Sequence, residues 1–477
     1  MTGVQTCALP ISAEACTSSA TLDLEIHHRD ALTGEPWAGS VDVCLMNPPF
    51  VAWPDMTPDQ RETVASTLAE LHQRRPDMAM AFLRRAVDTL VDGGAIGAVL
   101  PASFLDGDSS APMREFLSAS LALKLSARLG NQAVFTDVTV DPALVVMRRC
   151  SIDRHRLPTL LVWADHNLGS SDLALRALRR HENPTEVSCL ESNQQFSIYS
   201  VPAQAVVENW APRPYRSARL LAALADKPKV GTLFSVQQGT ITGMNTVFML
   251  STEEFESLPK TEQQFFRPAV TNDSINDGCL RATAWVFYPH GTGLPELISE
   301  AEVASRLKHF YKLRLLPYKD ALLRRARIGK ENWWRLSEHR NWQVERRPKI
   351  VSTYFGASGS FAFDRTGDHV VVQGYGWLPK KSFGEEQHLL ALVASLNTPV
   401  ADVLLAGVSN NLAGGQWNLS KRFIERMPLV DVLHLPEELL HALALAGESL
   451  TRGNGSDRGR LNELTYQAFG ISAAFDS

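Results

Sequence analysis

The chain has 477 residues, of which 44% are hydrophobic and 21% are charged, and its formal net charge is -5. This length and apolar content exclude a disordered chain and allow two or three domains with ordinary cores. No run approaches the roughly 18 apolar residues of a membrane span, and the start lacks the pattern of a secretory signal. We therefore expect a cytoplasmic protein without membrane contact.

The cysteines and the net charge constrain the chemistry further. The six cysteines lack the close pairing of zinc sites, so we expect free thiols and no metal: Cys7, Cys16, Cys44, Cys150, Cys189 and Cys279. A negative chain disfavours a nucleic-acid partner on average, but local basic segments decide such binding.

The first twelve residues, MTGVQTCALPIS, resemble the translation of a sequencing-library adapter. We interpret residues 1–12 as an artefact to be left out of the fold. A native coil leader is the alternative, because the segment has no periodic pattern.

From residue 13 to residue 202, apolar runs alternate with amphipathic stretches, which predicts an α/β domain. Val41–Met46 is expected to form a short buried strand and Asp77–Leu90 a helix that Gly93 and Gly94 stop. Ala95–Leu100 predicts another buried strand. Val138–Met147 is typical of a strand near a sheet edge, interrupted by Pro142.

After residue 203 the regular alternation gives way to proline-containing segments, polar loops and short strands such as Val370–Val372. Residues 203–477 are therefore expected to form a second, α+β domain.

The motif Asn47-Pro48-Pro49-Phe50 directly follows the strand expected at Val41–Met46. It would emerge at the carboxyl end of a parallel strand, where open α/β sheets hold ligands. The Asn47 amide oxygen and the Pro48 carbonyl oxygen can accept hydrogen bonds from an exocyclic amine, while two prolines fix the backbone. Phe50 offers a face for a base extruded from a duplex. An ordinary turn after a strand is the alternative.

With these residues the sequence resembles the adenine-specific DNA methyltransferases of restriction-modification systems, in the gamma-type order with a carboxyl-terminal target-recognition domain. The resemblance covers most of the chain. It also rests on Asp30-Ala31-Leu32, on the helix from Asp77, and on the segments Gly93–Leu105 and Phe135–Arg149. It implies an incomplete Rossmann-like methyltransferase sheet in residues 13–202, a target-recognition domain in residues 203–477, and methyl transfer from S-adenosylmethionine to adenine in double-stranded DNA.

The resemblance assigns roles to single residues. Asn47, Pro48, Pro49 and Phe50 would be catalytic, and Asp30, Leu32 and Asn47 would bind the cofactor. Phe50 and Phe135 would stack on the target base. Asp30 could instead be a solvated loop carboxylate, and Phe135 a core aromatic residue.

The sequence departs from the family in one respect. The glycine-rich cofactor loop and the acidic residue for the ribose should lie before residue 13, and neither is present. We therefore expect an N-terminally truncated chain that binds the cofactor weakly or not at all and has poor solubility. A restriction endonuclease subunit or a fused nuclease domain is a further partner that the resemblance allows.

Between Arg306 and Lys349, fourteen basic residues face four acidic ones, with Trp333, Trp334 and Trp342 interleaved. This composition is typical of nucleic-acid contact, although a solvated helix face would look similar. The expected DNA-binding residues are Arg324, Arg325, Arg327, Lys330, Arg346 and Lys349.

Two other functions compete with DNA methylation. The first is methylation of a protein glutamine or of a ribosomal RNA guanine, which the size of the second domain disfavours. The second is an inactive DNA-binding fragment, which the missing cofactor loop favours. Adjacent His27 and His28 would point to opposite sides of a strand, so they do not predict a metal site.

Overall fold

The computed structural model divides the chain into two units, Met1–Pro212 and Arg213–Ser477, so the division falls after the boundary expected at residue 203. The structure describes residues 30–33, 41–130, 141–149, 158–181, 184–206, 209–291, 294–325, 327–380, 383–412, 416–455 and 457–472. Each unit is considered by itself.

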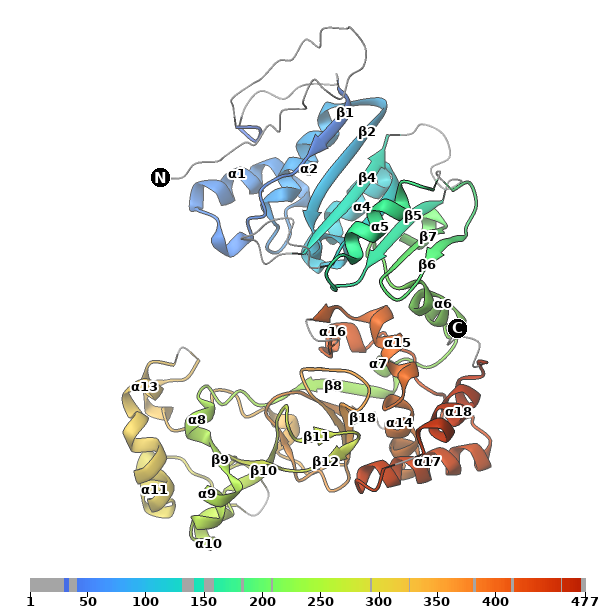
Figure 1. Cartoon of the computed structure of the whole chain (residues 1–477). Helices are drawn as coiled ribbons and strands as arrows, with labels where there is room; N and C mark the ends of the chain where they lie inside the picture. Colours follow the sequence, from blue (N-terminus) through green and yellow to red (C-terminus); the bar gives the residue numbers. More distant parts are fainter. Residues whose placement is uncertain are drawn as a thin grey trace. The chain divides into compact units, whose positions relative to one another are not determined.

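Unit 1 is built on a seven-stranded sheet with the order β1-β2-β4-β3-β5-β7-β6 (Figure 1). The strands are β1 (Val41–Met46), β2 (Leu90–Pro101), β3 (Ala122–Arg128), β4 (Pro142–Arg148), β5 (Thr159–Ala164), β6 (Cys189–Ser192) and β7 (Phe196–Val201). The pairs β1–β2 and β3–β5 are parallel, whereas β2–β4, β3–β4, β5–β7 and β6–β7 are antiparallel. The α/β class predicted from the sequence is confirmed, with a mixed sheet.

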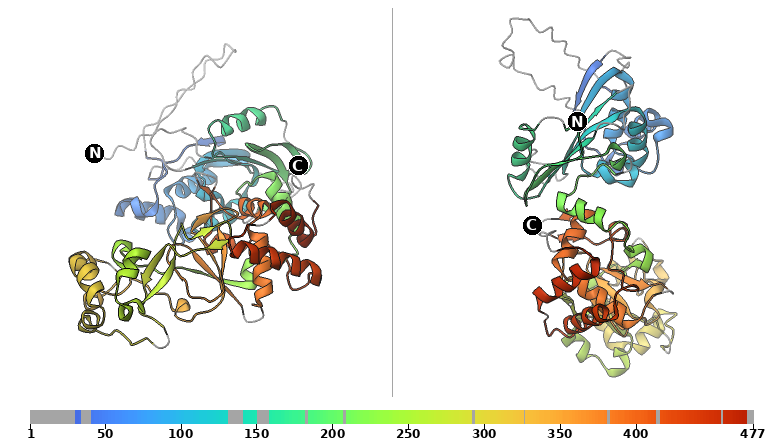
Figure 2. Two further views of the ribbon diagram at one scale, coloured as in Figure 1. Left: turned by 60° about the horizontal axis from the view of Figure 1, so that its bottom comes forward. Right: turned by 90° about the vertical axis from the view of Figure 1, so that its right-hand side faces the viewer.

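Helices flank this sheet. They are α1 (Pro58–Leu68), α2 (Met78–Thr89), α3 (Ser103–Asp106), α4 (Ala111–Ser120) and α5 (Ser170–Leu178). Figure 2 shows α5 on one face of the sheet and α1 and α2 on the other. The apolar stripe of α2, which includes Leu83 and Val87, is buried as its helical spacing requires.

Three expectations for unit 1 need correction. Among the described strands β1 is at the edge of the sheet, so Val43 and Leu45 are 58% and 78% exposed instead of buried. Conversely, β4 lies inside the sheet between β2 and β3, and Pro142 is its first residue. Helix α2 ends at Thr89, before Gly93, which has a φ of +82° and lies in β2 where the register of pairing with β1 shifts.

Unit 2 contains two four-stranded sheets, ordered β17-β10-β13-β9 and β16-β14-β18-β8, and two smaller ones, β11-β12 and β15-β20-β19. The strands are β8 (Phe234–Gln238), β9 (Met249–Ser251), β10 (Phe266–Val270), β11 (Ile275–Asn276), β12 (Cys279–Leu280), β13 (Ala284–Phe287), β14 (Lys349–Ser352), β15 (Phe355–Gly356), β16 (Phe361–Asp364), β17 (Val370–Val371), β18 (Tyr375–Pro379), β19 (Asn411–Leu412) and β20 (Gln416–Asn418). Strands β14 and β16 pair antiparallel.

The helices of unit 2 pack around two main cores. They are α6 (Tyr215–Ala223), α7 (Val230–Leu233), α8 (Asn245–Phe248), α9 (Thr252–Ser257), α10 (Lys260–Gln263), α11 (Glu300–Arg306), α12 (Lys308–Phe310), α13 (Lys319–Leu323), α14 (Glu386–Leu396), α15 (Pro399–Val408), α16 (Lys421–Ile424), α17 (Glu437–Thr451) and α18 (Arg458–Phe469). One core joins α14, α17 and α18 to the β14–β18–β8 sheet, and the other surrounds β10 and β13.

In the described parts of the chain, no single helix has the length and apolar character to cross a membrane. The pair α14 and α15 passes this test by length and composition, but the two helices are bent by 80° and are largely buried in the first core.

Candidate active site and basic surface

The Asn47–Phe50 turn begins directly after β1, as its position in the sequence predicts. Because β1 and β2 are parallel, this turn and the segment after Pro101 lie at the same edge of the sheet. Asn47 and Pro49 are exposed, Pro48 is buried and Phe50 is half-buried. The amide of Asn47 is therefore open to a ligand while the proline beneath it anchors the turn.

The chain after this turn is fixed by contacts with α1 and α2. The main-chain N–H of Met78 donates to the carbonyl of Val51 at 3.1 Å. The Arg61 guanidinium donates to the carbonyls of Trp53 and Pro54, at 3.0 and 2.9 Å. The indole of Trp53 packs against His72, with ring centroids 5.1 Å apart. These contacts restrict the motion of the loop that carries the motif.

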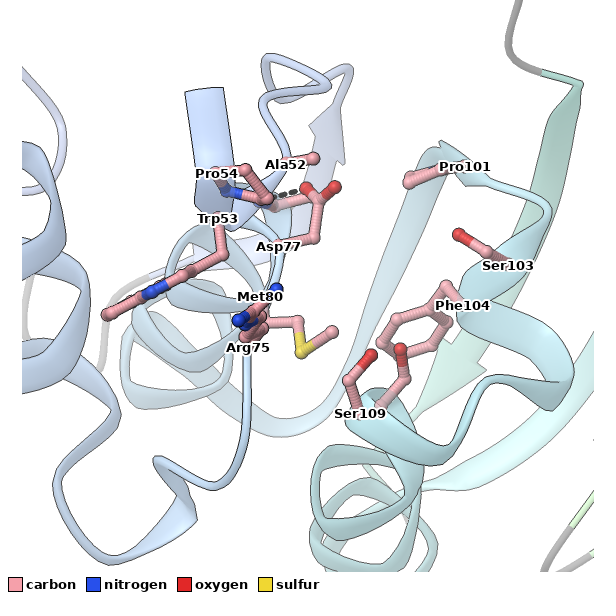
Figure 3. Close-up of a pocket in the computed structure, with 12 residues that line it drawn as sticks. Ala52, Trp53, Pro54, Arg75, Asp77, Met80, Pro101, Ser103, Phe104 and Ser109 are labelled. Carbon is pink, nitrogen blue, oxygen red and sulfur yellow. Dashed lines mark hydrogen bonds between the residues drawn. The ribbon is translucent and has the colours of Figure 1, made fainter. Parts of the chain in front are cut away.

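A cavity of about 160 Å³ lies next to the motif, and its first lining residue, Ala52, is two positions after Phe50 (Figure 3). It is lined by Ala52, Trp53, Pro54, Arg75, Asp77, Ala79, Met80, Pro101, Ser103, Phe104, Ser109 and Ser110. Figure 3 shows the Asp77 carboxylate on one side and Pro101, Ser103 and Phe104 on the other. A cavity of about 150 Å³ can hold a benzene ring, so the size suits a planar heterocycle.

Asp77 is the acidic group of this cavity, and sequence reasoning took it only as the start of a helix. Its carboxylate caps α2 by accepting from the N–H of Ala79 at 3.0 Å. Burial raises the pKa of Asp77 to about 6, against the opposing effect of that hydrogen bond. The sequence signal for Asp77 is its position: it follows the Asn47–Phe50 motif along the chain and directly precedes the apolar helix α2.

The proposed cofactor residues lie against the same helix. Asp30 is exposed and accepts from the N–H of Leu32 at 2.8 Å, and Leu32 is buried. The Arg85 guanidinium of α2 donates to the Leu32 carbonyl at 2.5 Å. Arg85 is two helical turns beyond Asp77, roughly 12 Å along the axis, so this turn and the cavity occupy different ends of α2. Phe135 lies outside the described residues.

The basic segment of unit 2 exposes fewer of its side chains to a nucleic-acid partner than its composition predicts. Its first part, from Lys308 to Leu323, consists of the short helices α12 and α13 with a π turn and a 3-10 turn between them. Trp333 and Trp334 are 2% and 1% exposed and belong to the second core, so they cannot stack on bases. Trp342 is half-buried and its Nε1 donates to the Gln238 carbonyl at 3.1 Å.

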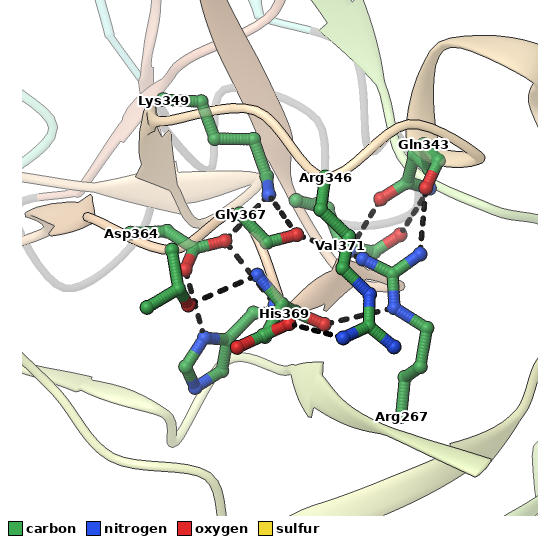
Figure 4. A network of polar contacts seen from close by, with 10 residues as sticks. Arg267, Gln343, Arg346, Lys349, Asp364, Gly367, His369 and Val371 are labelled. Carbon is green, nitrogen blue, oxygen red and sulfur yellow. Dashed lines mark hydrogen bonds and ion pairs between the residues drawn. The ribbon is translucent and has the colours of Figure 1, made fainter. Parts of the chain in front are cut away.

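Two of the six expected DNA-binding residues are structural. The Arg325 guanidinium donates to the carbonyls of Thr242 and Arg335, both at 2.8 Å, and thereby joins two loops. Lys349 is 3% exposed and pairs with Asp364 inside the unit (Figure 4). Neither cation is presented to a phosphate, so these two expectations are wrong.

The Lys349–Asp364 pair belongs to a buried polar network. Burial lowers the pKa of Lys349, against the effect of the Asp364 carboxylate. Burial would raise the pKa of Asp364, but the hydrogen bond from His369 and the Lys349 charge outweigh it and lower that pKa. Arg267 completes the network by donating to the carbonyls of Gln343, Gly367 and Asp368.

The other four expected DNA-binding residues, Arg324, Arg327, Lys330 and Arg346, are exposed. Arg327 pairs with Glu338, and Arg346 pairs with Asp368 at 3.0 Å. Exposure keeps all four available to a charged partner. Their contact with DNA stays a prediction.

The Asn47–Phe50 turn at the carboxyl end of the parallel strand β1 lies in a part of the chain that resembles known methylases. Residues 16–135 match the model of the Eco57I restriction-modification methylase family. This part of the chain is similar to the methylase domain of that family.

The relatives are distant. The Type II methyltransferase M.XhoI of Xanthomonas vasicola is 22% identical over 460 residues, which cover 92% of this chain and 76% of the relative. The Type IIL restriction-modification enzyme MmeI was solved in complex with DNA. Its match covers 90% of this chain and 55% of the MmeI chain, with 12% sequence identity and a TM-score of 0.55. The type IIG restriction endonuclease BpuSI matches 92% of this chain at 15% identity, with a TM-score of 0.36. The chain spans about half the length of these two solved proteins, 55% and 54%.

Proposed function

We propose that the protein transfers a methyl group from S-adenosylmethionine to the exocyclic amine of adenine in double-stranded DNA, within a restriction-modification system. The observation that carries this proposal is the anchored Asn47–Phe50 turn beside a cavity of about 160 Å³. The methylase-family match over residues 16–135 supports the reaction class.

The turn would act on the target amine by positioning it. The amine lone pair is delocalised into the adenine ring, which makes the nitrogen a poor nucleophile. The exposed Asn47 amide oxygen and the Pro48 carbonyl oxygen would accept the two amine hydrogens and favour a tetrahedral nitrogen. Phe50 would stack on the extruded base, and the fixed prolines would keep the acceptors in place.

The described residues fit the adenine end of the cofactor. One oxygen of the Asp30 carboxylate accepts from Leu32, and the exposed carboxylate can still accept from an amine. Buried Leu32 would contribute an apolar contact below the ring. When bound, the cofactor supplies an electrophilic methyl group on its sulfonium.

A transfer assay tests the proposal. The full chain is incubated with plasmid DNA and tritiated S-adenosylmethionine, and the DNA is digested to nucleosides for mass spectrometry. At a saturating concentration of the cofactor we expect N6-methyladenine, and at least about 100-fold less of it with Asn47→Ala. Label in protein or RNA but not in DNA, or no label with duplex binding intact, would instead support one of the two competing functions.

A further inference from the structure

Two loops of unit 2 that are distant in sequence, residues 238–243 and 338–343, lie side by side. Ile241 and Glu338 exchange main-chain hydrogen bonds of 3.0 and 2.9 Å. The Thr240 hydroxyl donates to the His339 carbonyl at 3.0 Å, and the buried Gln343 amide donates to that hydroxyl at 2.8 Å. These paired loops form one fixed element, and Asn341–Gln343 of the second loop is a 3-10 turn.

Arg340, in the second of the paired loops, has an unusual backbone. Its φ of +61° lies in the left-handed region, which side chains with a Cβ rarely adopt. The Tyr288 hydroxyl donates to the carbonyls of His339 and Arg340, at 2.8 and 3.2 Å, and fixes this conformation. Rare conformations that the surroundings enforce are concentrated at functional sites.

The Arg340 guanidinium is held in one orientation by its neighbours. Nη1 pairs with Glu338 at 2.7 Å, Nε donates to the Gly239 carbonyl at 3.2 Å, and Nη2 donates to the Gln238 side chain at 3.3 Å. A guanidinium has five N–H groups, so donors remain for a ligand. The side chain is 28% exposed, and the Gln238 side chain beside it is exposed.

The charge around Arg340 argues for a base and against a phosphate as its ligand. Glu338 lies between Arg340 and Arg327, which binds its other carboxylate oxygen. The Glu338 carboxylate partly neutralises the positive charge of Arg340, which weakens its attraction for a phosphate. The remaining N–H donors of the Arg340 guanidinium keep their orientation. An oriented arginine fork matches the paired O6 and N7 acceptors of guanine in the major groove.

We propose that Arg340, oriented by Glu338 and Gln238, donates to a guanine edge in the major groove of duplex DNA and so sets part of the sequence specificity. The inference rests on the proposed function and deepens it, because it assigns a residue to the choice of target.

The test measures sequence preference and stability together. The full chain, Arg340→Gly, Arg340→Lys and the control Arg460→Ala select duplexes from a library with a randomised central segment, and the bound fraction is sequenced. Glycine accepts a positive φ, so Arg340→Gly removes the fork without adding backbone strain. Arg340→Lys keeps the charge and removes the fork. Arg460 is an exposed arginine of α18, paired with Glu463 at 3.2 Å.

We expect the wild-type chain and Arg460→Ala to enrich guanine at one position. Both Arg340 variants should lose that enrichment by about 10- to 100-fold and keep the other positions. Their melting temperatures and the salt dependence of binding to a fixed duplex should stay close to wild type.

Other results would overturn the inference. An unchanged preference in Arg340→Gly and Arg340→Lys would do so alone. So would a lower affinity for all sequences with a salt slope reduced by about one, because that is the behaviour of a phosphate contact. A wild-type chain that binds no duplex would contradict the proposed function itself, and the inference with it.

Discussion

The main-chain N–H of Met78 donates to the carbonyl oxygen of Val51 at 3.1 Å, and this contact joins the first turn of α2 to the loop that follows Asn47–Phe50. The cap of the same helix is Asp77, whose carboxylate lines the adjoining cavity. Helix, cavity and motif therefore form one local unit, and changes at the start of α2 should be felt at the site.

Asn47→Ala should reduce turnover by about 100-fold or more, because it removes an acceptor that acts on the reacting amine. Duplex affinity should change by only a few-fold, since the charged contacts remain. Steady-state kinetics and equilibrium binding on the same preparation measure both quantities. Asn454→Ala, at an exposed asparagine of unit 2, is the control. Equal losses of turnover and affinity would contradict the catalytic role of Asn47.

Asp77 should make stability depend on pH in an unusual direction. Its pKa is about 6 in the fold and 3.8 in a model peptide, so between these values the folded state binds more protons than the unfolded state. The unfolding free energy should therefore fall as pH rises from about 4 to about 6, by an amount on the order of 2 kcal/mol, and then level off.

Asp77→Asn removes this titration and keeps a capping oxygen. Urea unfolding of both proteins across pH 4–7 gives the difference curve. The unfolding free energy of the wild type minus that of Asp77→Asn should fall between pH 4 and pH 6. If this difference is flat or rises with pH, Asp77 is not buried as described.

Lys349→Ala should lower the unfolding free energy by about 3 to 5 kcal/mol, because it leaves the Asp364 carboxylate buried without its cation. Lys330→Ala removes an exposed cation and should change it by less than about 0.5 kcal/mol. Denaturant unfolding compares the two variants. Similar stabilities, together with a reduced salt slope of DNA binding in Lys349→Ala, would restore Lys349 as a phosphate contact.

Arg324→Ala, Lys330→Ala and Arg346→Ala should each weaken binding to duplexes of any sequence. Each lost phosphate contact should reduce the slope of log affinity against log salt by about one. Fluorescence anisotropy with a labelled duplex at several salt concentrations measures this slope, with Arg460→Ala as the control. A slope unchanged in all three variants would place the DNA on another surface of the protein.

The sequence predicted what depends on neighbouring residues. The β1 strand, the Asn47–Phe50 turn after it and the helix capped by Asp77 are each encoded within a few positions, and the structure contains all three. It failed where the outcome depends on partners far along the chain. Periodicity indicated β1 as a strand, but which strands flank it is decided by the sheet order, which leaves Leu45 exposed.

The basic segment shows the same limit. Local composition does not reveal that Lys349 is buried against Asp364 of another strand, or that Trp334 belongs to a core. Arg340 was one basic residue among fourteen in the sequence. Its unusual φ and its contacts with Gln238 and Gly239 arise only after the chain has folded.

The strand β8, which ends at Gln238, pairs with β18, and β18 lies much later in the chain. During synthesis β8 cannot pair until β18 has been made. The long loop between them must close, at a cost in conformational entropy, before their hydrogen bonds stabilise the pair. A nascent chain that stops before Pro379 therefore lacks the β8–β18 pair next to Gln238, on which the proposed contact of Arg340 with DNA depends. The proposed contact can therefore form only after most of the chain has been synthesised.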